Sequence, residues 1–308
     1  MARARLRIVQ LNVLAPSARI CEPLGRLPWR ERHAAACDAL ASLRPDVICL
    51  QEYDFCPGTE GFTELYREKL PGYALFTAQR TGHKVDGLAL ALRDGVFEDV
   101  HQAATPLQPS SCDRVVTIAT MVHRASGRRV AVANTHLTVA HVNAFDIPLN
   151  RPWQMKQVLE LLAAAAPVDG SPVARFCCGD LNSDHMDTEA ATGECDMFYG
   201  HQYSYSAEEV ARPVHMAFEQ GFRSALHESL AGGVRPISHT SGYTRDGCTD
   251  YVLYAPEAAR LEEAWLFPRD IPPDRAWSPS GGWGAALDAR ATFSDHRPLV
   301  ADFTLGCR

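Results

Sequence analysis

The chain has 308 residues, of which 46% are apolar and 22% charged, and its formal net charge at pH 7 is −7. This composition is typical of a globular protein and excludes a disordered, collagenous or coiled-coil chain. No apolar run approaches the roughly 18 residues of a membrane-spanning helix, so we expect no membrane span. The acidic balance argues against a protein that grips long duplex nucleic acid through a basic surface.

The spacing of apolar residues predicts a chain in which strands and helices are interspersed. In chain order, the expected elements are a strand at 6–15, a helix at 28–43, strands at 46–51, 85–93, 115–123 and 129–137, a helix at 152–166, a strand at 173–178, a helix from 206 towards 218, and strands at 248–254 and 299–305. The segment 125–128 predicts a hairpin turn between two of these strands. The stretches 184–205 and 268–292 lack such patterns, so we expect them to be irregular. Together these elements indicate a mixed sheet system covered by helices.

Polar residues recur where the expected strands begin or end. They are Asn12, Gln51, Glu52, Asn134, His136, Asp180, Asn182, Asp250, Asp295 and His296. Taken singly, each has an ordinary explanation: Asn12 can be a satisfied structural amide, and residues 180–183 can form an Asx turn. Because buried polar groups are costly without partners, the repetition of the same residue types at the same kind of position predicts one shared site.

The residue types in this set suit metal-assisted cleavage of a phosphate ester. Carboxylates can hold a hard cation such as Mg²⁺ and activate a water molecule, while amides and imidazoles can hold phosphoryl oxygens. The sequence contains no G-x-S-x-G motif and no Walker loop that would indicate a serine nucleophile or a P-loop. Residue types alone leave open which carboxylate binds the cation and which activates water.

The motifs that carry these residues resemble those of the endonuclease/exonuclease/phosphatase superfamily. They are LNVLA (11–15), LQE (50–52), NTHL (134–137), GDLNS (179–183), TDYV (249–252) and SDH (294–296). Within the superfamily, the chain is most similar to the deadenylase-like branch of carbon catabolite repressor type nucleases, nocturnin and Angel proteins. The segments behind this finer resemblance are 12–15, 85–87, 113–115 and 151–154.

The resemblance implies a single domain over residues 1–308, folded as a four-layer α/β/β/α sandwich of two mixed sheets flanked by helices. It also implies a role for each residue of the site. Glu52 is expected to be the principal Mg²⁺ ligand (Mn²⁺ being possible), with Asn12 and Asp295 near the metal; Asp180 is expected to orient or deprotonate the attacking water, His136 and Asn182 to hold phosphate oxygens, and Asp250 to orient His296, which stabilises the transition state.

The expected activity is that of a 3′–5′ exoribonuclease acting on single-stranded RNA ends, poly(A) included. A phosphatase or phosphodiesterase acting on a small NADP(H)-like nucleotide is the alternative, and a lipid phosphodiesterase or a non-catalytic binding scaffold is less favoured. Arg114, Tyr243 and Arg245 are candidate substrate-binding residues, although a tyrosine in the position of Tyr243 is more often an ordinary loop aromatic. The sequence has no leucine-rich repeat, so we expect no repeat-mediated docking partner.

Two further patterns bear on metal and location. The acidic stretch 184–205 could hold a second metal, but a solvated acidic loop is the favoured interpretation. Ten scattered cysteines without a C-x-x-C pair argue against a structural zinc site and predict a reduced, intracellular location, cytoplasmic or nuclear.

Overall fold

The fold is taken from a computed structural model of the chain. The structure describes residues 4–17, 28–109, 113–138, 147–165, 171–186, 191–195, 201–205, 207–230, 233–239, 247–274 and 293–306.

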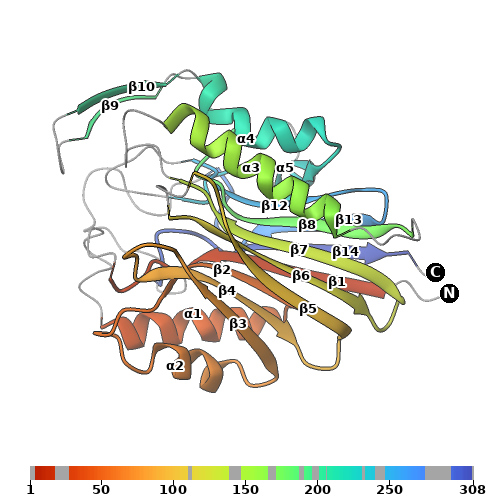
Figure 1. Cartoon of the computed structure of the whole chain (residues 1–308). Helices are drawn as coiled ribbons and strands as arrows, with labels where there is room; N and C mark the ends of the chain where they lie inside the picture. The colour runs from red at the N-terminus through yellow and green to blue at the C-terminus, as the bar shows by residue number, and fades with distance from the viewer. Residues whose placement is uncertain are drawn as a thin grey trace.

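Two six-stranded sheets pack face to face in the middle of the molecule (Figure 1). In spatial order, the first sheet contains β13 (Ala259–Leu266), β14 (Leu299–Leu305), β1 (Ala4–Asn12), β2 (Val47–Asp54), β4 (Asp86–Arg93) and β3 (Tyr73–Gln79). The second contains β11 (Arg223–Ser224), β12 (Asp250–Tyr254), β8 (Val173–Asp180), β7 (Arg128–His136), β6 (Val115–His123) and β5 (Phe97–Pro106). The β1–β2 and β7–β8 pairs are parallel and the other pairs antiparallel, so both sheets are mixed.

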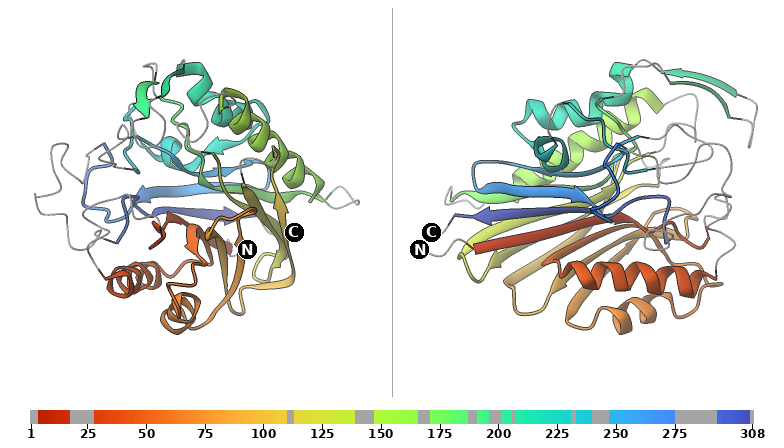
Figure 2. Two further views of the ribbon diagram at one scale, coloured as in Figure 1. Left: turned by 60° about the vertical axis from the view of Figure 1, so that its left-hand side comes forward. Right: turned by 180° about the vertical axis from the view of Figure 1, so that it is seen from behind.

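Helices cover the outer face of each sheet and complete four layers, as the two views of Figure 2 show. The first sheet is covered by α1 (Trp29–Leu43) and α2 (Phe62–Lys69), and the second by α3 (Ile147–Ala164), α4 (Ala207–Glu219) and α5 (Ala225–Ser229). A separate antiparallel pair, β9 (Ala191–Cys195) and β10 (His201–Tyr205), extends beyond the second helical layer in Figure 1. The fold class predicted from the sequence is confirmed.

The alternation of side chains along β1 shows why the layers form. Leu6 and Ile8 are fully buried in the core between the two sheets. Val9 and Leu11 point to the other face and are fully buried in a cluster with residues of α1. Burying each such side chain contributes roughly 1.5–3 kcal/mol, so both faces of the strand stabilise the sandwich.

Each strand and helix expected from the sequence has a counterpart, although several boundaries differ; β2, for example, ends at Asp54 and not at residue 51. β1 ends at Asn12 and not at residue 15, because the backbone turns at Leu14, whose φ is 55°. α3 begins at Ile147, five residues before Pro152, and contains that proline near its N-terminus. A proline at this position removes one helical hydrogen bond, which the packed helix tolerates.

The expectation that residues 184–205 are irregular is wrong in part, because β9 and β10 lie within them. These two short strands pair with each other and not with a larger sheet, so main-chain hydrogen bonds define them without the apolar alternation of a core strand. In the stretch 268–292, residues 268–274 are irregular as expected and 275–292 lie outside the described residues. Among the described helices, none combines the length and apolarity that a membrane span requires.

Candidate active site

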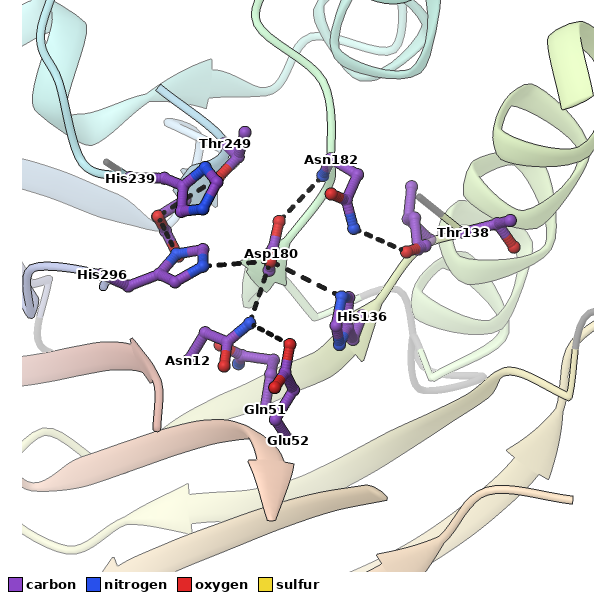
Figure 3. A network of polar contacts seen from close by, with 12 residues as sticks. Asn12, Gln51, Glu52, His136, Thr138, Asp180, Asn182, His239, Thr249 and His296 are labelled. Atoms are coloured by element: carbon purple, nitrogen blue, oxygen red, sulfur yellow. Dashed lines mark hydrogen bonds and ion pairs between the residues drawn. The ribbon is translucent and has the colours of Figure 1, made fainter. Parts of the chain in front are cut away.

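The predicted site residues converge at one end of the sandwich because the strands that carry them end or begin there (Figure 3). In the second sheet, Asp180 at the end of β8 lies opposite His136 at the end of β7 and opposite Asp250 at the start of β12. In the first sheet, the parallel pairing of β1 and β2 brings Asn12 opposite Gln51, next to Glu52. The clustering inferred from polar strand ends is therefore present in the structure.

Glu52 reaches the site through a bulge in β2. The register of β2 against β4 shifts between Gln51 and Tyr53, and Glu52 has a φ of 53°. A bulge re-aims a side chain, and a non-glycine residue in this conformation is strained by about 1–2 kcal/mol. The carboxylate accepts hydrogen bonds from Asn12 Nδ2 (3.0 Å) and from the Ala15 amide (3.3 Å).

Asn12 connects the two sheets across the centre of the site. Its Nδ2 donates to Oε1 of Glu52 at 3.0 Å and to Oδ2 of Asp180 at 3.1 Å, as Figure 3 shows. Its Oδ1 accepts the amide hydrogen of Leu14 at 3.0 Å. In this orientation Asn12 presents a donor to both carboxylates, which fixes the distance between them.

His296 and Asp250 form a buried ion pair beside Asp180. Nδ1 of His296 lies 2.8 Å from Oδ2 of Asp250, and its Nε2 lies 3.8 Å from Oδ2 of Asp180 and 3.9 Å from Oδ1 of Asp295. Burial lowers the pKa of His296, but these three carboxylates outweigh it and raise the pKa to about 10. At neutral pH His296 is an imidazolium that directs its positive charge to the space between Asp180 and Asp295.

Asp180 lies at the centre of the network, with contacts on several sides (Figure 3). Besides Asn12 and His296, its carboxylate accepts the amide hydrogen of Asn182 at 2.9 Å and faces Nε2 of His136 at 3.5 Å. Burial raises the pKa of Asp180, and His296 opposes that rise only in part. A buried carboxylate with a raised pKa is suited to accept a proton from an attacking water molecule.

Asn182 and His136 lie on the opposite side of Asp180 from His296. Asn182 has a φ of 47°, and its Nδ2 donates to the carbonyl oxygen of Leu137 at 2.9 Å. Burial first, and then the neighbouring Arg114, lower the pKa of His136 well below its usual value. His136 is therefore neutral at physiological pH, where it can both donate and accept a hydrogen bond.

The donors around Glu52 and Asp295 fit a hard divalent cation. Burial raises the pKa of Glu52, and the like charge of Asp295 raises it further, which is the pattern expected of carboxylates arranged around a cation. Carboxylate oxygens are the ligands that Mg²⁺ prefers. Within the described residues, His239, Asp295 and His296 also place one potential ligand atom each within 4.8 Å of one another, but imidazole suits softer metals than Mg²⁺.

Sequence reasoning missed residues that hold the site from behind. Gln10 Nε2 donates to Oδ1 of Asp250 at 2.8 Å, and Ser238 Oγ donates to Oδ2 of Asp250 at 2.6 Å. His239 stacks on His296 with ring centroids 4.3 Å apart, and its Nε2 lies 3.7 Å from Oδ2 of Asp295. The alternation of inward-facing residues along β1 could have identified Gln10. Ser238 and His239 belong to no motif that the sequence would have revealed.

Two of the predicted polar strand ends have a structural role. Gln51 Nε2 donates to Oδ1 of Asn134 at 2.7 Å, and Asn134 Nδ2 donates to the carbonyl oxygens of Leu50 and Ala89 at 3.1 and 2.9 Å. Gln10 Nε2 also donates to Oε1 of Gln51 at 2.7 Å. This amide chain joins the two sheets behind the site, so Gln51 and Asn134 support the site without facing it.

The segment 151–154 anchors α3 to the site. Gln154 and Thr138 are joined by two hydrogen bonds, from Thr138 N to Oε1 at 3.0 Å and from Nε2 to Thr138 Oγ1 at 2.8 Å. The guanidinium of Arg151 donates to the carbonyl oxygen of Asn182. Both contacts hold the ends of β7 and β8 in register with the helix.

The candidate substrate-binding residues have different outcomes. Arg114 is buried, and its charge contributes to lowering the pKa of His136. Tyr243 and Arg245 lie outside the described residues, as do residues 187–190 and 196–200 of the acidic stretch in which a second metal was considered. His185, at the start of that stretch, contacts the hydroxyl of Tyr251 through Nδ1 at 3.0 Å.

Comparisons with known proteins agree with this geometry. Residues 9–296 match the model of the Endonuclease/Exonuclease/phosphatase family. Nocturnin of Drosophila melanogaster is 25% identical over 97% of this chain, which spans 47% of that protein's length. The human Nocturnin catalytic domain, solved with a bound sulfate anion, superposes with a TM-score of 0.67 at 22% identity, covering 98% of this chain and 97% of that one. ANGEL2, described as a 2′,3′-cyclic phosphatase, superposes with a TM-score of 0.68 at 19% identity, covering 98% and 96% of the two chains.

Proposed function

The chain belongs to the Endonuclease/Exonuclease/phosphatase family, and from that premise we propose that it is a divalent-metal-dependent hydrolase of phosphate esters in RNA or nucleotides. One observation carries the proposal: the Nε2 atom of the charged His296 lies within 4 Å of carboxylate oxygens of both Asp180 and Asp295. A base, a cation and a metal-ligating carboxylate thus border one small space, as hydrolysis of a phosphate ester requires.

The residues of the site divide the chemistry between them. Glu52 and Asp295 would hold the divalent cation, which supplies positive charge to the phosphoryl oxygens. Asp180 accepts the proton of the attacking water, since its raised pKa makes it a better base than an exposed carboxylate. His296 stabilises the negative charge that develops on the phosphoryl group, and Asp250 keeps it protonated and oriented.

For the substrate, we propose the 3′ end of single-stranded RNA, cleaved as by a 3′–5′ exoribonuclease. The resemblance of its motifs to the deadenylase-like branch supports this choice, and the net charge of −7 favours short single-stranded ends over long duplexes. A small phosphorylated nucleotide is the second candidate. It is favoured by Arg114, whose buried Nε and Nη1 atoms find no acceptor among the residues that the structure describes and could bind a compact anionic ligand.

A hydrolysis assay with matched variants tests the proposed function. The purified protein is offered poly(A) RNA, mixed-sequence RNA and NADPH with Mg²⁺, with Mn²⁺ or with EDTA. We expect hydrolysis that requires the metal and falls at least about 100-fold in Asp180→Asn. The control is Glu98→Gln, which removes an exposed carboxylate paired with Arg124 away from the site. A folded wild-type protein that is inert on all three substrates with either metal contradicts the proposal.

The metal site has a readout that does not depend on activity. Because burial and Asp295 raise the pKa of Glu52, its ionised form is disfavoured in the metal-free fold. We therefore expect Glu52→Gln to be at least as stable as the wild type in EDTA. Mg²⁺ should raise the melting temperature of the wild type but not of the variant. An equal shift in both proteins would remove Glu52 from the metal site.

A further inference from the structure

Arg32 places a charged side chain on the buried face of α1, the helix that covers the first sheet (Figure 1). The buried residues of this helix recur at helical spacing; they are Arg32, His33, Ala36, Cys37, Leu40 and Leu43. Arg32 is 5% exposed. Burying a guanidinium is costly unless its N–H groups find acceptors. An arginine where an apolar side chain would suffice for packing therefore indicates a specific binding task.

The guanidinium of Arg32 binds main-chain carbonyl oxygens of two segments that are far apart in the sequence. Its Nη1 donates to the carbonyl oxygen of Val13 at 2.9 Å and to that of Phe293 at 2.8 Å. Its Nη2 donates to the carbonyl oxygen of Leu14 at 2.5 Å. One planar, charged group thus joins residues 13–14 to residue 293, through hydrogen bonds that are stronger than those between neutral groups.

The backbone of the first segment turns so that it meets Arg32. In an extended strand, successive carbonyl groups point in opposite directions, and one side chain cannot bind two of them. Directly after β1 the backbone turns at Leu14, whose φ is 55°. The Leu14 amide closes the turn by donating to Oδ1 of Asn12 at 3.0 Å. Two consecutive carbonyl oxygens therefore lie within reach of the same guanidinium.

The same turn holds the proposed metal ligand Glu52. Nδ2 of Asn12 donates to Oε1 of Glu52 at 3.0 Å, and the Ala15 amide donates to Oε2 at 3.3 Å. These two donors lie on either side, along the chain, of the carbonyl groups that Arg32 binds. A displacement of residues 13–14 would therefore move both hydrogen bonds to the Glu52 carboxylate.

The second segment carries the other proposed ligand, Asp295, two residues after Phe293. Phe293 is buried in a cluster that also contains residues of α1. Ser294 provides a second link between the segments: its Oγ donates to the carbonyl oxygen of Asn12 at 2.6 Å and accepts the amide hydrogen of His296 at 3.1 Å. Arg32 and Ser294 thus join the turn after β1 to the segment that precedes β14.

We propose that Arg32 is a positioning residue that fixes the Glu52 and Asp295 carboxylates relative to each other and so sets the affinity of the site for its divalent cation. This inference rests on the proposed function, which assigns these carboxylates to the cation. Mg²⁺ requires near-ideal octahedral geometry at short distances. A small displacement between the two segments should therefore weaken cation binding more than it disturbs the fold.

Two variants alter the guanidinium and leave the rest of α1 unchanged. Arg32→Lys keeps the charge but lacks the planar fork that binds three carbonyl oxygens at once, and Arg32→Gln also removes the charge. The control is Leu40→Ala, about two turns along the same buried face of α1. This substitution leaves a cavity and lowers stability without removing a hydrogen bond to either segment.

Mg²⁺ binding, measured by calorimetry, tests the consequence for the site. We expect the affinity of Arg32→Lys to fall at least about fivefold, somewhat less than the roughly 10–100-fold typical of groups that contact a metal ligand directly. Leu40→Ala should bind Mg²⁺ like the wild type although its melting temperature falls. In a hydrolysis assay, Arg32→Lys should need more Mg²⁺ for its half-maximal rate, with kcat at saturating Mg²⁺ close to that of the wild type. Unchanged affinity in both Arg32 variants, or an equal loss in Leu40→Ala, overturns the proposal.

Hydrogen exchange in EDTA detects the link between the segments without any metal. The Leu14 amide donates to Asn12 and the His296 amide donates to Ser294, one in each segment. Because Arg32 holds both segments, we expect both amides to exchange faster in Arg32→Lys than in the wild type, and to stay slow in Leu40→Ala. Faster exchange in only one segment, or in neither, overturns the proposal.

The outcomes separate this inference from the proposed function. Mg²⁺ binding that depends on Arg32 without any hydrolysis retains the inference and rejects the proposed function. Metal-dependent hydrolysis with Mg²⁺ affinity that ignores Arg32 rejects the inference alone. A wild type that binds neither Mg²⁺ nor Mn²⁺ rejects both. If neither Arg32 variant folds, Ser294→Ala removes the second link, and unchanged Mg²⁺ affinity in that variant overturns the proposal.

Discussion

At the scale of single residues, His296 owes its charge to the carboxylates around it. Asp250 holds Nδ1 at 2.8 Å, and Ser238 in turn holds Asp250 at 2.6 Å, so one imidazole is supported by a graded series of contacts. The nearer a group lies to the imidazolium, the more its loss should affect the charge that His296 offers to the substrate.

Substitutions in this series should lower the rate in a graded manner. Asp250→Asn removes the charge that keeps His296 protonated, and we expect kcat to fall at least about 100-fold. Ser238→Ala removes one of the hydrogen bonds to Asp250, so a loss of about tenfold or less is expected. Steady-state kinetics on any accepted substrate measure both. If Ser238→Ala is as damaging as Asp250→Asn, the charge of Asp250 is not what matters.

Much of the candidate site was predictable because its residues are exceptions to a rule: a buried strand is expected to end in apolar or turn residues, not in charged ones. Asp180 and Asp250 break that expectation, and both belong to the cluster in the structure. Assigning Glu52 to the metal depended on resemblance to a family, since its side chain enters through a bulge that no sequence pattern marks. His239 could not be found, because it lies in an isolated bridge outside the named strands.

At the scale of elements, the close approach of β7 and β8 depends on Gly179. Its φ is 153°, and a Cβ atom placed there would lie 2.0 Å from the carbonyl oxygen of Thr135 on the neighbouring strand. That oxygen belongs to the backbone and cannot rotate away. Gly179 also precedes Asp180, so its small size sets the position of the proposed base.

Gly179→Ala should therefore damage the fold. We expect a loss of at least about 3 kcal/mol in the free energy of unfolding, since two strands must separate to admit the methyl group. Gly127→Ala is the matched control: it has a φ of 66°, but nothing lies within 4 Å of its Cβ position, so about 1 kcal/mol is expected from backbone strain alone. Urea unfolding compares the two, and equal losses would contradict the steric argument.

The elements that sequence analysis did not predict share a physical cause. β5 is exposed along most of its length, so its residues show no apolar alternation. α2 has 8 residues and buries Phe62 and Tyr66, which is too short a pattern to identify a helix. By contrast, β1 and β8 are buried on both faces, and their apolar runs identified them. Prediction therefore succeeded for elements whose burial requires apolar residues. It failed for elements that face solvent, because exposure places no such requirement on their residues.

At the scale of the whole molecule, the two halves of the sandwich meet in a polar seam at the site end and an apolar core elsewhere. Gln10, Gln51 and Asn134 cross from one sheet to the other, and Gln10 also reaches Asp250. Because these amide side chains are joined by buried hydrogen bonds, a displacement of one sheet relative to the other would break several of those hydrogen bonds at once. The position of the active-site residues is in this sense a property of both sheets together.

The stability of the whole molecule should depend on pH through two histidines that burial holds neutral: His185, which packs against Phe218 of α4, and His227, which belongs to α5. His185 and His227 pack edge to face with ring centroids 4.3 Å apart, and Nδ1 of His185 lies 3.0 Å from the hydroxyl of Tyr251. Burial lowers the pKa of His185 to about 4, with Asp184 opposing and His215 adding to the shift. Burial and the neighbouring His185 lower the pKa of His227 to about 3.

The sign of the effect follows from these directions. Above about pH 6.5 both histidines are neutral whether the chain is folded or unfolded, so they do not affect the pH dependence. Below it, the unfolded chain binds protons that the folded chain excludes, and stability falls until the folded pKa values are reached. At pH 5 this amounts to roughly 2 kcal/mol for each histidine, since each pH unit corresponds to about 1.4 kcal/mol.

His227→Gln tests this account, because glutamine is polar and does not titrate. Between pH 8 and pH 5 the variant should lose roughly 2 kcal/mol less stability than the wild type, whatever its stability at pH 8. Urea unfolding at the two pH values measures the difference, and His101→Gln on exposed β5 is the control. If the wild type and the His227→Gln variant lose the same stability between pH 8 and pH 5, this buried cluster takes up protons without unfolding. Its histidines would then titrate within the native fold, and the acid sensitivity of the molecule would have to arise from other buried groups such as His33 and His123, whose pKa values burial also lowers.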